Sequence, residues 1–202
     1  GNTEISNSSF IGYDNALTST GIKVSGYAGY NIGGNTNISY STLSNFETGL
    51  IFDGINTISI TNNNFLTNSL YNVKNNTSFD LILENNFWGT SIESEIQETI
   101  YDYGDDIDLG AVDYSPFSTT LNTTAPISPP SNVTKSVLGS DVVLNWSANG
   151  ESDLAGYKLH YGDPTGYSYT TTIDLGNITS YSLSGGNIAT EYAITAYDSS
   201  LD

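Results

Sequence analysis

A spacing of 22 residues between two similar segments constrains the fold of this chain more than any other feature. The segment ITNNNF ends at Phe65, and the segment LENNF ends at Phe87. Leu43 lies 22 residues before Phe65, and Phe10 lies a further 33 before Leu43. An aliphatic residue stands five positions before each of these four, namely Ile5, Ile38, Ile60 and Ile82. The chain therefore contains an internal repeat, with one insertion between its first two copies.

Short alternating segments lie between these motifs, and they predict strands of three to five residues. They are GIKV from Gly21, GLIF from Gly49, ISI from Ile58 and LYNV from Leu70. A repeat of this length with about three short strands is typical of a right-handed parallel β-helix, in which each strand pairs with its equivalent one coil away.

The asparagines before each aromatic residue fit the corners of such coils. Asn tolerates left-handed backbone angles better than any residue except Gly, and stacked Asn side chains can hydrogen-bond as a ladder. We therefore expect Asn62–Asn64 to lie over Asn85 and Asn86, and Phe65 to stack on Phe87 inside the coils.

The repeat ends after Trp88, where the period changes. Ile92, Ile96 and Ile100 recur every four residues in TSIESEIQETI, which predicts a short amphipathic helix. Thr90 and Glu93 have the spacing of a capping box. We expect this helix to cover the exposed end of the last coil, because an unpaired sheet edge promotes aggregation.

A second pattern follows a Thr- and Pro-rich segment, residues 119–130, which has the composition of a semi-rigid linker. From residue 131 to 202 the chain alternates apolar and polar residues in short runs separated by turns. Val142, Leu144 and Trp146 share one face of a predicted strand, and Tyr157 and Leu159 share another. This pattern predicts an antiparallel β-sandwich.

Residues 131–202 resemble a fibronectin type III domain. Trp146 matches the core Trp of its second strand, Leu183 the Leu before the penultimate strand, and Tyr192 the tyrosine-corner position. The resemblance implies that the last strand of the sandwich is missing, since the chain stops at AYDSSLD. The chain is then either an excerpt of a longer polypeptide or is completed by neighbouring chains.

Residues 1–118 resemble the C-terminal coils and cap of a right-handed parallel β-helix of the pectate-lyase-like superfamily. NNFWGT, followed by IQETIYDYGDDIDLGAVDYSPF, is similar to the closing cap of exported prokaryotic repeat proteins. The resemblance implies an architecture and leaves the activity open. The predicted fold class is thus all-β, a β-helix with a short capping helix followed by a sandwich.

The charge balance restricts the partners. The chain has 22 acidic residues against 4 Lys, with a net charge of -18. Phosphate backbones and anionic membrane surfaces repel such a chain, so we expect no nucleic-acid binding and no membrane insertion. No apolar run is long enough to span a bilayer. The absence of Cys excludes disulfides and thiolate metal sites.

Catalysis has little support in the sequence, although pectate-lyase-like folds include polysaccharide lyases and hydrolases. Lyases of this kind need a basic residue beside carboxylates, and hydrolases need clustered acids. The repeats offer only Lys23 and Lys74 as bases, with scattered acids. His160, the only histidine, is expected to face outward on a strand of the sandwich.

Two kinds of binding site can be predicted. Asp105, Asp106 and Asp108 lie in an acidic, Gly-containing loop that suits Ca²⁺, although an EF-hand spacing is absent and a solubilising loop gives the same composition. Tyr27 and Tyr30 are candidates for stacking on sugar rings, and ordinary packing of β structure is the alternative interpretation. Calcium is the only cofactor that the sequence suggests.

Together these observations predict an extracellular or cell-surface protein with a structural or adhesive function, contacting polysaccharide or partner proteins. Two alternatives stay open. The chain could be the non-catalytic part of a carbohydrate-active β-helix enzyme, or a filament subunit that self-associates through open β edges.

Overall fold

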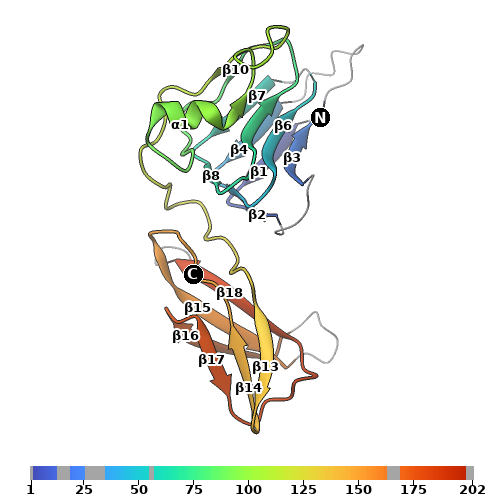
Figure 1. Cartoon of the computed structure of the whole chain (residues 1–202), viewed down its shortest axis with the longest axis vertical. Helices are drawn as coiled ribbons and strands as arrows, with labels where there is room; N and C mark the ends of the chain where they lie inside the picture. The colour runs from blue at the N-terminus through green and yellow to red at the C-terminus, as the bar shows by residue number, and fades with distance from the viewer. Residues whose placement is uncertain (1, 13–18, 26–34, 55–56, 163–168, 199–202) are drawn as a thin grey trace. The chain divides into compact units, whose positions relative to one another are not determined.

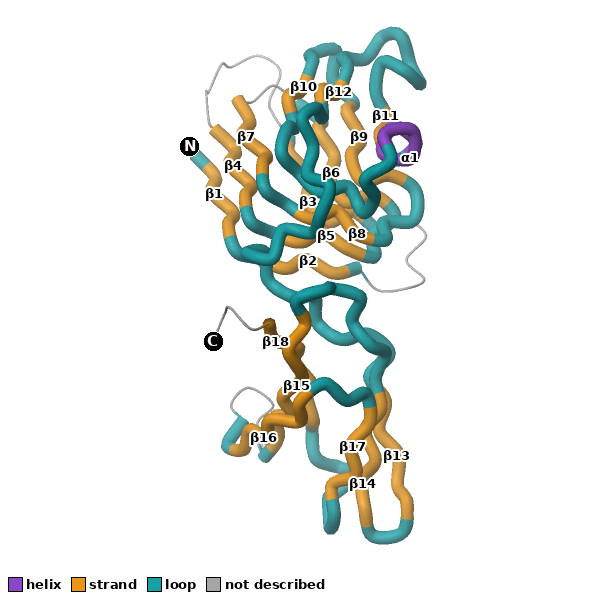
Figure 2. Tube along the Cα trace, turned by 90° about the vertical axis from the view of Figure 1, so that its left-hand side faces the viewer, coloured by secondary structure: helices purple, strands orange, loops and turns teal. Residues whose placement is uncertain are grey.

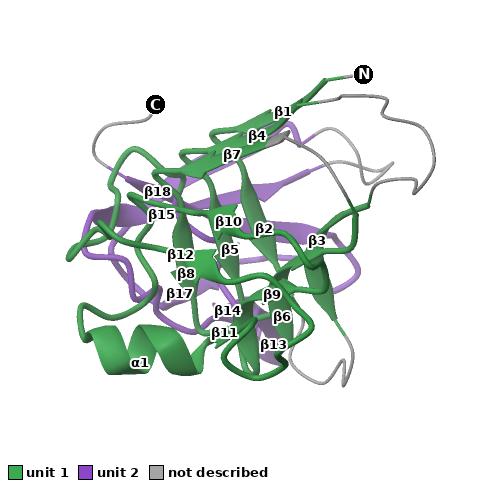
Figure 3. Ribbon diagram, turned by 90° about the horizontal axis from the view of Figure 1, so that it is seen from above, with its two compact units in different colours: residues 1–126 green, residues 127–202 purple. Residues whose placement is uncertain are grey.

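The repeat builds parallel sheets in the computed structural model, which describes residues 2–12, 19–25, 35–54, 57–162 and 169–198. The chain divides into two units, Gly1–Pro126 and Ile127–Asp202, which Figure 3 colours separately. Each unit has its own apolar core. The fold is all-β, with one short helix among the described residues (Figure 1).

Three parallel sheets make up most of the first unit (Figure 2). The first sheet has the order β1 (Thr3–Ser6), β4 (Asn35–Ser39), β7 (Thr57–Thr61). The second has the order β2 (Ser9–Ile11), β5 (Thr42–Ser44), β8 (Asn64–Leu66). The third, which we call the long sheet, has the order β3 (Thr20–Val24), β6 (Thr48–Phe52), β9 (Tyr71–Asn75), β11 (Ile100–Tyr101). The chain thus visits each sheet once per repeat.

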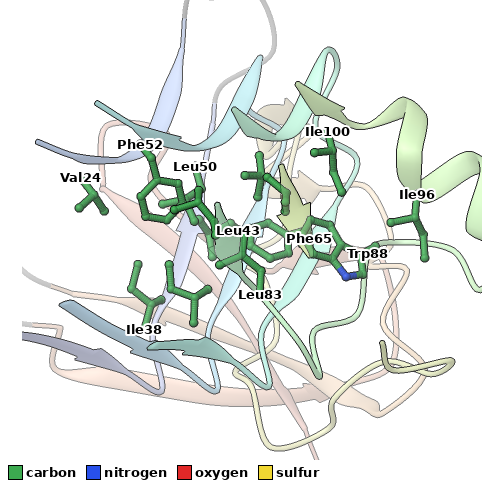
Figure 4. Packing of buried hydrophobic residues seen from close by; sticks show 14 residues of the cluster. Val24, Ile38, Leu43, Leu50, Phe52, Phe65, Leu83, Trp88, Ile96 and Ile100 are labelled. Atoms are coloured by element: carbon green, nitrogen blue, oxygen red, sulfur yellow. The ribbon is translucent and has the colours of Figure 1, made fainter. Parts of the chain in front are cut away.

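Equivalent positions in the first three copies of the repeat stack in register, as the sequence predicts, whereas Ile82 in the fourth copy is 63% exposed. Ile38 pairs with Ile5 on one side and Ile60 on the other, and Leu43 pairs with Phe10 and Phe65 in the same way. Ile38, Leu43 and Phe65 belong to one continuous core cluster (Figure 4). Ile5 and Phe10 are partly buried and pack against it. Because side chains alternate along a strand, the residues between them face outward.

The last repeat is one residue out of step with the prediction. Phe87 forms a parallel bridge with Asn64, so Trp88 is the residue opposite Phe65. The rings of Phe65 and Trp88 stack with centroids 5.0 Å apart (Figure 4). The predicted stack of Phe87 on Phe65 is therefore wrong. The equivalent corner residues Asn62 and Asn85 are 23 positions apart, one more than the repeat of 22 that the prediction assumes.

The asparagines divide into three roles that the predicted ladder did not separate. Asn62 and Asn85 have positive φ angles of 59° and 62° and form the corners. Asn63 and Asn86 are wholly buried, and the Asn63 side-chain amide donates to Oδ1 of Asn86 over 3.0 Å. Asn64 points away from the core. The ladder therefore consists of the second asparagine of each corner, Asn63 and Asn86.

This ladder satisfies backbone groups inside the corners. Oδ1 of Asn63 accepts the N–H of Ser41 in the preceding coil, and its Nδ2 donates to the carbonyl of Ile38. Asn86 repeats the pattern, since its Oδ1 accepts the N–H of Asn63 and its Nδ2 donates to the carbonyl of Ile60. Buried backbone groups need such partners, which explains why Asn recurs there.

The helix after the repeat, α1 (Glu93–Glu98), is shorter than predicted. Ile96 is wholly buried in the core, but Ile92 is 52% exposed. Ile100 is buried as part of β11, because its segment pairs with β9 and extends the long sheet. The predicted capping box is wrong as well. The Thr90 hydroxyl donates to Glu95 and accepts the N–H of Ile92, and Glu93 is not its partner.

The segment predicted as a linker makes specific contacts within the first unit up to Pro126. Ser118 bridges Phe87, and the N–H of Asn122 donates to Oδ1 of Asn64 over 2.8 Å. The hydroxyl of Thr42 donates to the carbonyl of Pro126. Asn64 and Thr42 face outward on the second sheet, so residues 118–126 run across its outer surface.

The second unit consists of two antiparallel sheets of three strands each in the described residues. One sheet has the order β13 (Thr134–Leu138), β14 (Asp141–Asn145), β17 (Ser180–Leu183). The other has the order β16 (Thr171–Gly176), β15 (Leu154–Tyr161), β18 (Tyr192–Asp198). Both sheets contribute to one core, in which the ring of Trp146 meets that of Tyr157 edge-on at 5.4 Å. The predicted inward faces of these strands are confirmed.

Among the described residues, no helix has the length and apolar character needed to cross a membrane.

Candidate binding face

The outer surface of the long sheet gathers aromatic and basic side chains in one column. Lys23, Ile51, Lys74 and Tyr101 occupy equivalent positions on the four successive strands. Their neighbours along each strand, such as Leu50 and Val73, are wholly buried in the core. Because side chains alternate, the column faces away from the core.

Tyr71 and Lys74 each contact the ring of Tyr101, and we call Tyr71, Lys74 and Tyr101 the tyrosine–lysine face. The rings of Tyr71 and Tyr101 lie with centroids 5.4 Å apart at an interplanar angle of 58°. The Lys74 ammonium lies 4.4 Å from the centroid of the Tyr101 ring. All three side chains are half-buried, so they are held in place while part of each stays accessible.

Lys23 lies at the other end of the column and pairs with an acid. Its ammonium is 2.6 Å from a carboxylate oxygen of Asp53, which follows β6. Both side chains are 40% exposed or more, so water screens the pair and it contributes little to stability. The column thus presents one lysine paired with a carboxylate and one lysine packed on a ring.

The chemistry of the tyrosine–lysine face suits binding. Tyrosine rings offer flat apolar surface with a polar edge, and an ammonium donates to hydroxyl or carboxylate oxygens. Sugars present both apolar C–H faces and hydroxyl groups. Of the two lysines that the repeats offer as bases, Lys74 contacts an aromatic ring, and Lys23 contacts one exposed carboxylate.

The candidate sugar-binding residues Tyr27 and Tyr30 lie outside the described residues. Tyr71 and Tyr101 are not among the binding residues that the sequence predicts. Tyr71 lies in a correctly predicted strand, but Tyr101 follows Ile100, which the four-residue spacing of isoleucines places in the helix. Their contact depends on the pairing of β11 with β9, and no repeat of the sequence marks that pairing.

The candidate calcium residues lie in the loop between β11 and β12 (Val112–Asp113) and bond to nearby backbone groups. Oδ2 of Asp105 accepts the N–H of Asp102, and Oδ1 of Asp106 accepts the N–H of Asp108. No three acidic or histidine side chains in the described ranges are grouped as ligands for a metal ion. The structure therefore does not bring Asp105, Asp106 and Asp108 together.

A different aspartate organises this loop. Asp102 is buried, and its two carboxylate oxygens accept the N–H groups of Gly104 and Val112 over 2.9 and 2.7 Å. Val112 begins the strand that pairs with β10 (Leu81–Ile82). Asp102 thus connects the loop to the two-stranded sheet of β10 and β12.

His160 lies on the outer surface of the β16–β15–β18 sheet, as expected. Its ring nitrogens lie 3.0 Å from the Thr172 hydroxyl and 2.9 Å from the Thr195 hydroxyl. Partial burial, and secondarily the charge of Lys158, lower the pKa of His160 below its usual 6.5. Because two hydroxyls hold the ring, it has a structural role on this surface.

Comparisons with known proteins add little. No family model and no curated protein matches the chain. Among solved structures, the spore cortex lytic enzyme SleM of Clostridium perfringens aligns with 23% identity and a TM-score of 0.30. The alignment covers 37% of this chain and 24% of that enzyme. A similarity this low supports no argument about fold or function.

Proposed function

We propose that the chain is a modular extracellular or cell-surface protein with a structural and adhesive function. In this proposal the first unit is the last part of a right-handed parallel β-helix with its cap. The in-register parallel sheets, the left-handed asparagine corners and the buried asparagine ladder support this architecture. The helix α1 and the acidic loop that follows would form the cap.

The second unit, in the same proposal, is a fibronectin type III-like domain. Its strand order of three plus three and its core Trp146 agree with that architecture. The hydroxyl of Tyr192 donates to the carbonyl of Asn187, five residues upstream, over 3.0 Å. This is the contact of a tyrosine corner, in which a Tyr near the start of a late strand bonds back to the preceding loop.

The ligand that we propose for the first unit is a polysaccharide, bound without catalysis at the tyrosine–lysine face. The contacts of Tyr71 and Lys74 with the ring of Tyr101 are the observation that carries this proposal. Rings held by the sheet lose little conformational freedom on binding, which favours affinity. Extended polymers fit a surface built from parallel rows of side chains.

Binding to a panel of neutral and acidic polysaccharides, by affinity electrophoresis and by pull-down on insoluble polymers, tests this proposal. Tyr71→Ala and Tyr101→Ala should each weaken binding about fivefold, since an aromatic contact contributes about 1 kcal/mol. Tyr169→Ala is the matched control, because Tyr169 is 40% exposed but belongs to the second unit. If both first-unit variants bind as wild type does, the site is refuted.

Self-association is a second candidate, favoured by the sheet edges. Among the described strands, β1 pairs only with β4, and β18 pairs only with β15. Such edges present unpaired backbone groups to a neighbouring strand. Sedimentation velocity over a range of concentrations tests this function. A monomer at all concentrations would contradict it.

A further inference from the structure

The loop between β14 and β15, residues 146–153, contains buried polar atoms that have no partner among the described residues. The N–H of Asn149 donates to the Tyr157 hydroxyl, and its Nδ2 donates to the carbonyl of Ser128. Oε1 of Glu151 accepts the N–H of Ser128. These bonds hold the loop against the segment that precedes β13, so its side chains have fixed positions.

Three side-chain oxygens in this loop are buried and accept no hydrogen bond within the described ranges. They are Oδ1 of Asn149 and both carboxylate oxygens of Asp153. Each has less than 1 Å² of exposed surface. A buried acceptor without a donor costs about 1–3 kcal/mol, and more when it is charged. All three atoms are acceptors. The one unpartnered buried donor of the loop, Nε1–H of Trp146, bonds to none of them, so these oxygens lack a proton donor.

The charges near Asp153 increase this cost. Glu151 in the same loop and Asp198 at the end of β18 both act on it with like charge. The two lysines of this unit interact elsewhere, since Lys158 lies over the Tyr197 ring and Lys135 donates to the carbonyl of Thr190. No lysine in the described part of this unit therefore compensates an ionised Asp153.

We propose that the β14–β15 loop is a proton-controlled element, in which protonation of Asp153 supplies the missing donor and stabilises the second unit. The protonated carboxyl offers an O–H where the ionised form offers only acceptors. It also removes the repulsion from Glu151 and Asp198. The loop is then closed in mild acid and loosened as the pH rises. This inference is independent of the proposed binding function.

The direction of the pH dependence follows from the pKa of Asp153. Burial raises that pKa above its ordinary value of 3.8. The nearby N–H of the residue itself opposes this to a smaller extent, and the weaker effects of the Asp198 and Glu151 charges raise the pKa further. A raised pKa means that the folded state binds the proton more tightly than the unfolded state. The resulting stabilisation is complete below about pH 3.8 and is lost as the pH rises through the raised pKa.

Thermal unfolding of the full chain across pH tests the proposal, with Asp153→Asn as the main variant. The amide has the shape of the protonated acid but cannot ionise. The melting temperature of the second unit in Asp153→Asn should exceed that of wild type at pH 7. This difference should disappear as the pH falls toward 3.8. Equal melting temperatures at every pH would overturn the proposal.

Asp141→Asn is the matched control in the same unit. Hydrogen bonds, first from the Ser140 hydroxyl, lower the pKa of Asp141, so its ionised form stabilises the fold. This variant should be less stable than wild type at pH 7, and the difference should vanish below pH 3.8. The two substitutions thus shift the melting temperature in opposite directions at neutral pH.

Two further measurements distinguish protonation of Asp153 from a change in global stability and from cation binding. Hydrogen exchange of residues 147–153, corrected for the intrinsic pH dependence, should become faster in wild type as the pH rises and stay constant in Asp153→Asn. This readout holds even if the variant changes global stability. Millimolar Ca²⁺ at neutral pH should leave the melting temperature of wild type unchanged. If Ca²⁺ instead raises it in wild type but not in Asp153→Asn, the loop binds a cation and the proton proposal is overturned.

Discussion

The Trp88 indole stacks on the Phe65 ring with centroids 5.0 Å apart and an interplanar angle of 16°. Phe65 belongs to the last regular strand of the second sheet, and Trp88 occupies the equivalent position one coil later. Tyr114 meets the indole edge-on at 6.1 Å. Trp88 therefore ends the stacked core and joins it to the segment that follows the repeat.

Replacing Trp88 by Ala should destabilise the first unit by about 3–5 kcal/mol, because the indole is wholly buried and its removal leaves a large cavity. Chemical denaturation followed by far-UV circular dichroism measures the loss. Phe87→Ala is the matched control, since Phe87 is only half-buried and does not stack on Phe65. A larger effect at Phe87 than at Trp88 would contradict the observed register.

Asn63→Ala should destabilise the same unit through hydrogen bonding. The substitution leaves the N–H of Ser41 and the carbonyl of Ile38 without their partners in a buried corner. Each unpaired group costs roughly 1–3 kcal/mol. Asn85→Ala, an exposed corner position, should cost only the strain of its positive φ, about 1 kcal/mol. Equilibrium unfolding in urea compares the two, and equal losses would contradict the ladder.

The sequence predicts most of the first unit because its repeat carries the register. Ile5, Ile38 and Ile60 are equivalent in the sequence, and they pair in the structure. The prediction fails where the repeat changes length. A single extra residue before Phe87 exchanges the roles of Phe87 and Trp88, and two successive aromatic residues give no sign of which one faces inward.

Beyond the repeat, tertiary contacts override local pattern. Ile92, Ile96 and Ile100 share a helical period, yet Ile100 lies in a strand because the edge of β9 is available for pairing. The same pairing creates the contact between Tyr71 and Tyr101. The tyrosine–lysine face therefore depends on a long-range strand pairing, which the spacing of the isoleucines does not predict. Composition alone suggested calcium ligands at Asp105, Asp106 and Asp108, but backbone N–H groups nearby provide partners for Asp105 and Asp106.

Gly110→Ala should disrupt the loop after β11. A methyl group at Gly110 would overlap the backbone of Phe79 and Asp80, which cannot move without breaking the neighbouring bonds. Among these is the bond from Nδ2 of Asn75 to the carbonyl of Gly110. Overpacking of this kind costs about 1–3 kcal/mol or more. Gly104→Ala in the same loop meets only side-chain atoms, the nearest at 3.3 Å, and should cost less. Thermal unfolding of both variants tests the contrast.

His160 should make the second unit less stable as the pH falls. Its pKa in the folded protein is lowered by partial burial and by Lys158, so the unfolded chain takes up the proton first. The stability that the neutral ring contributes is present above pH 6.5 and is lost as the pH falls through the lowered pKa.

His160→Gln retains a polar side chain between the Thr172 and Thr195 hydroxyls but cannot be protonated. The melting temperature of wild type should therefore decrease relative to that of this variant as the pH drops below 6.5. This direction is opposite to that expected for Asp153, whose protonation stabilises the unit. A double variant, His160→Gln with Asp153→Asn, should lose both effects. If the melting temperatures of wild type and His160→Gln instead differ by the same amount from about pH 8 to about pH 4, the prediction is wrong. The ring would then titrate alike in the folded and unfolded states.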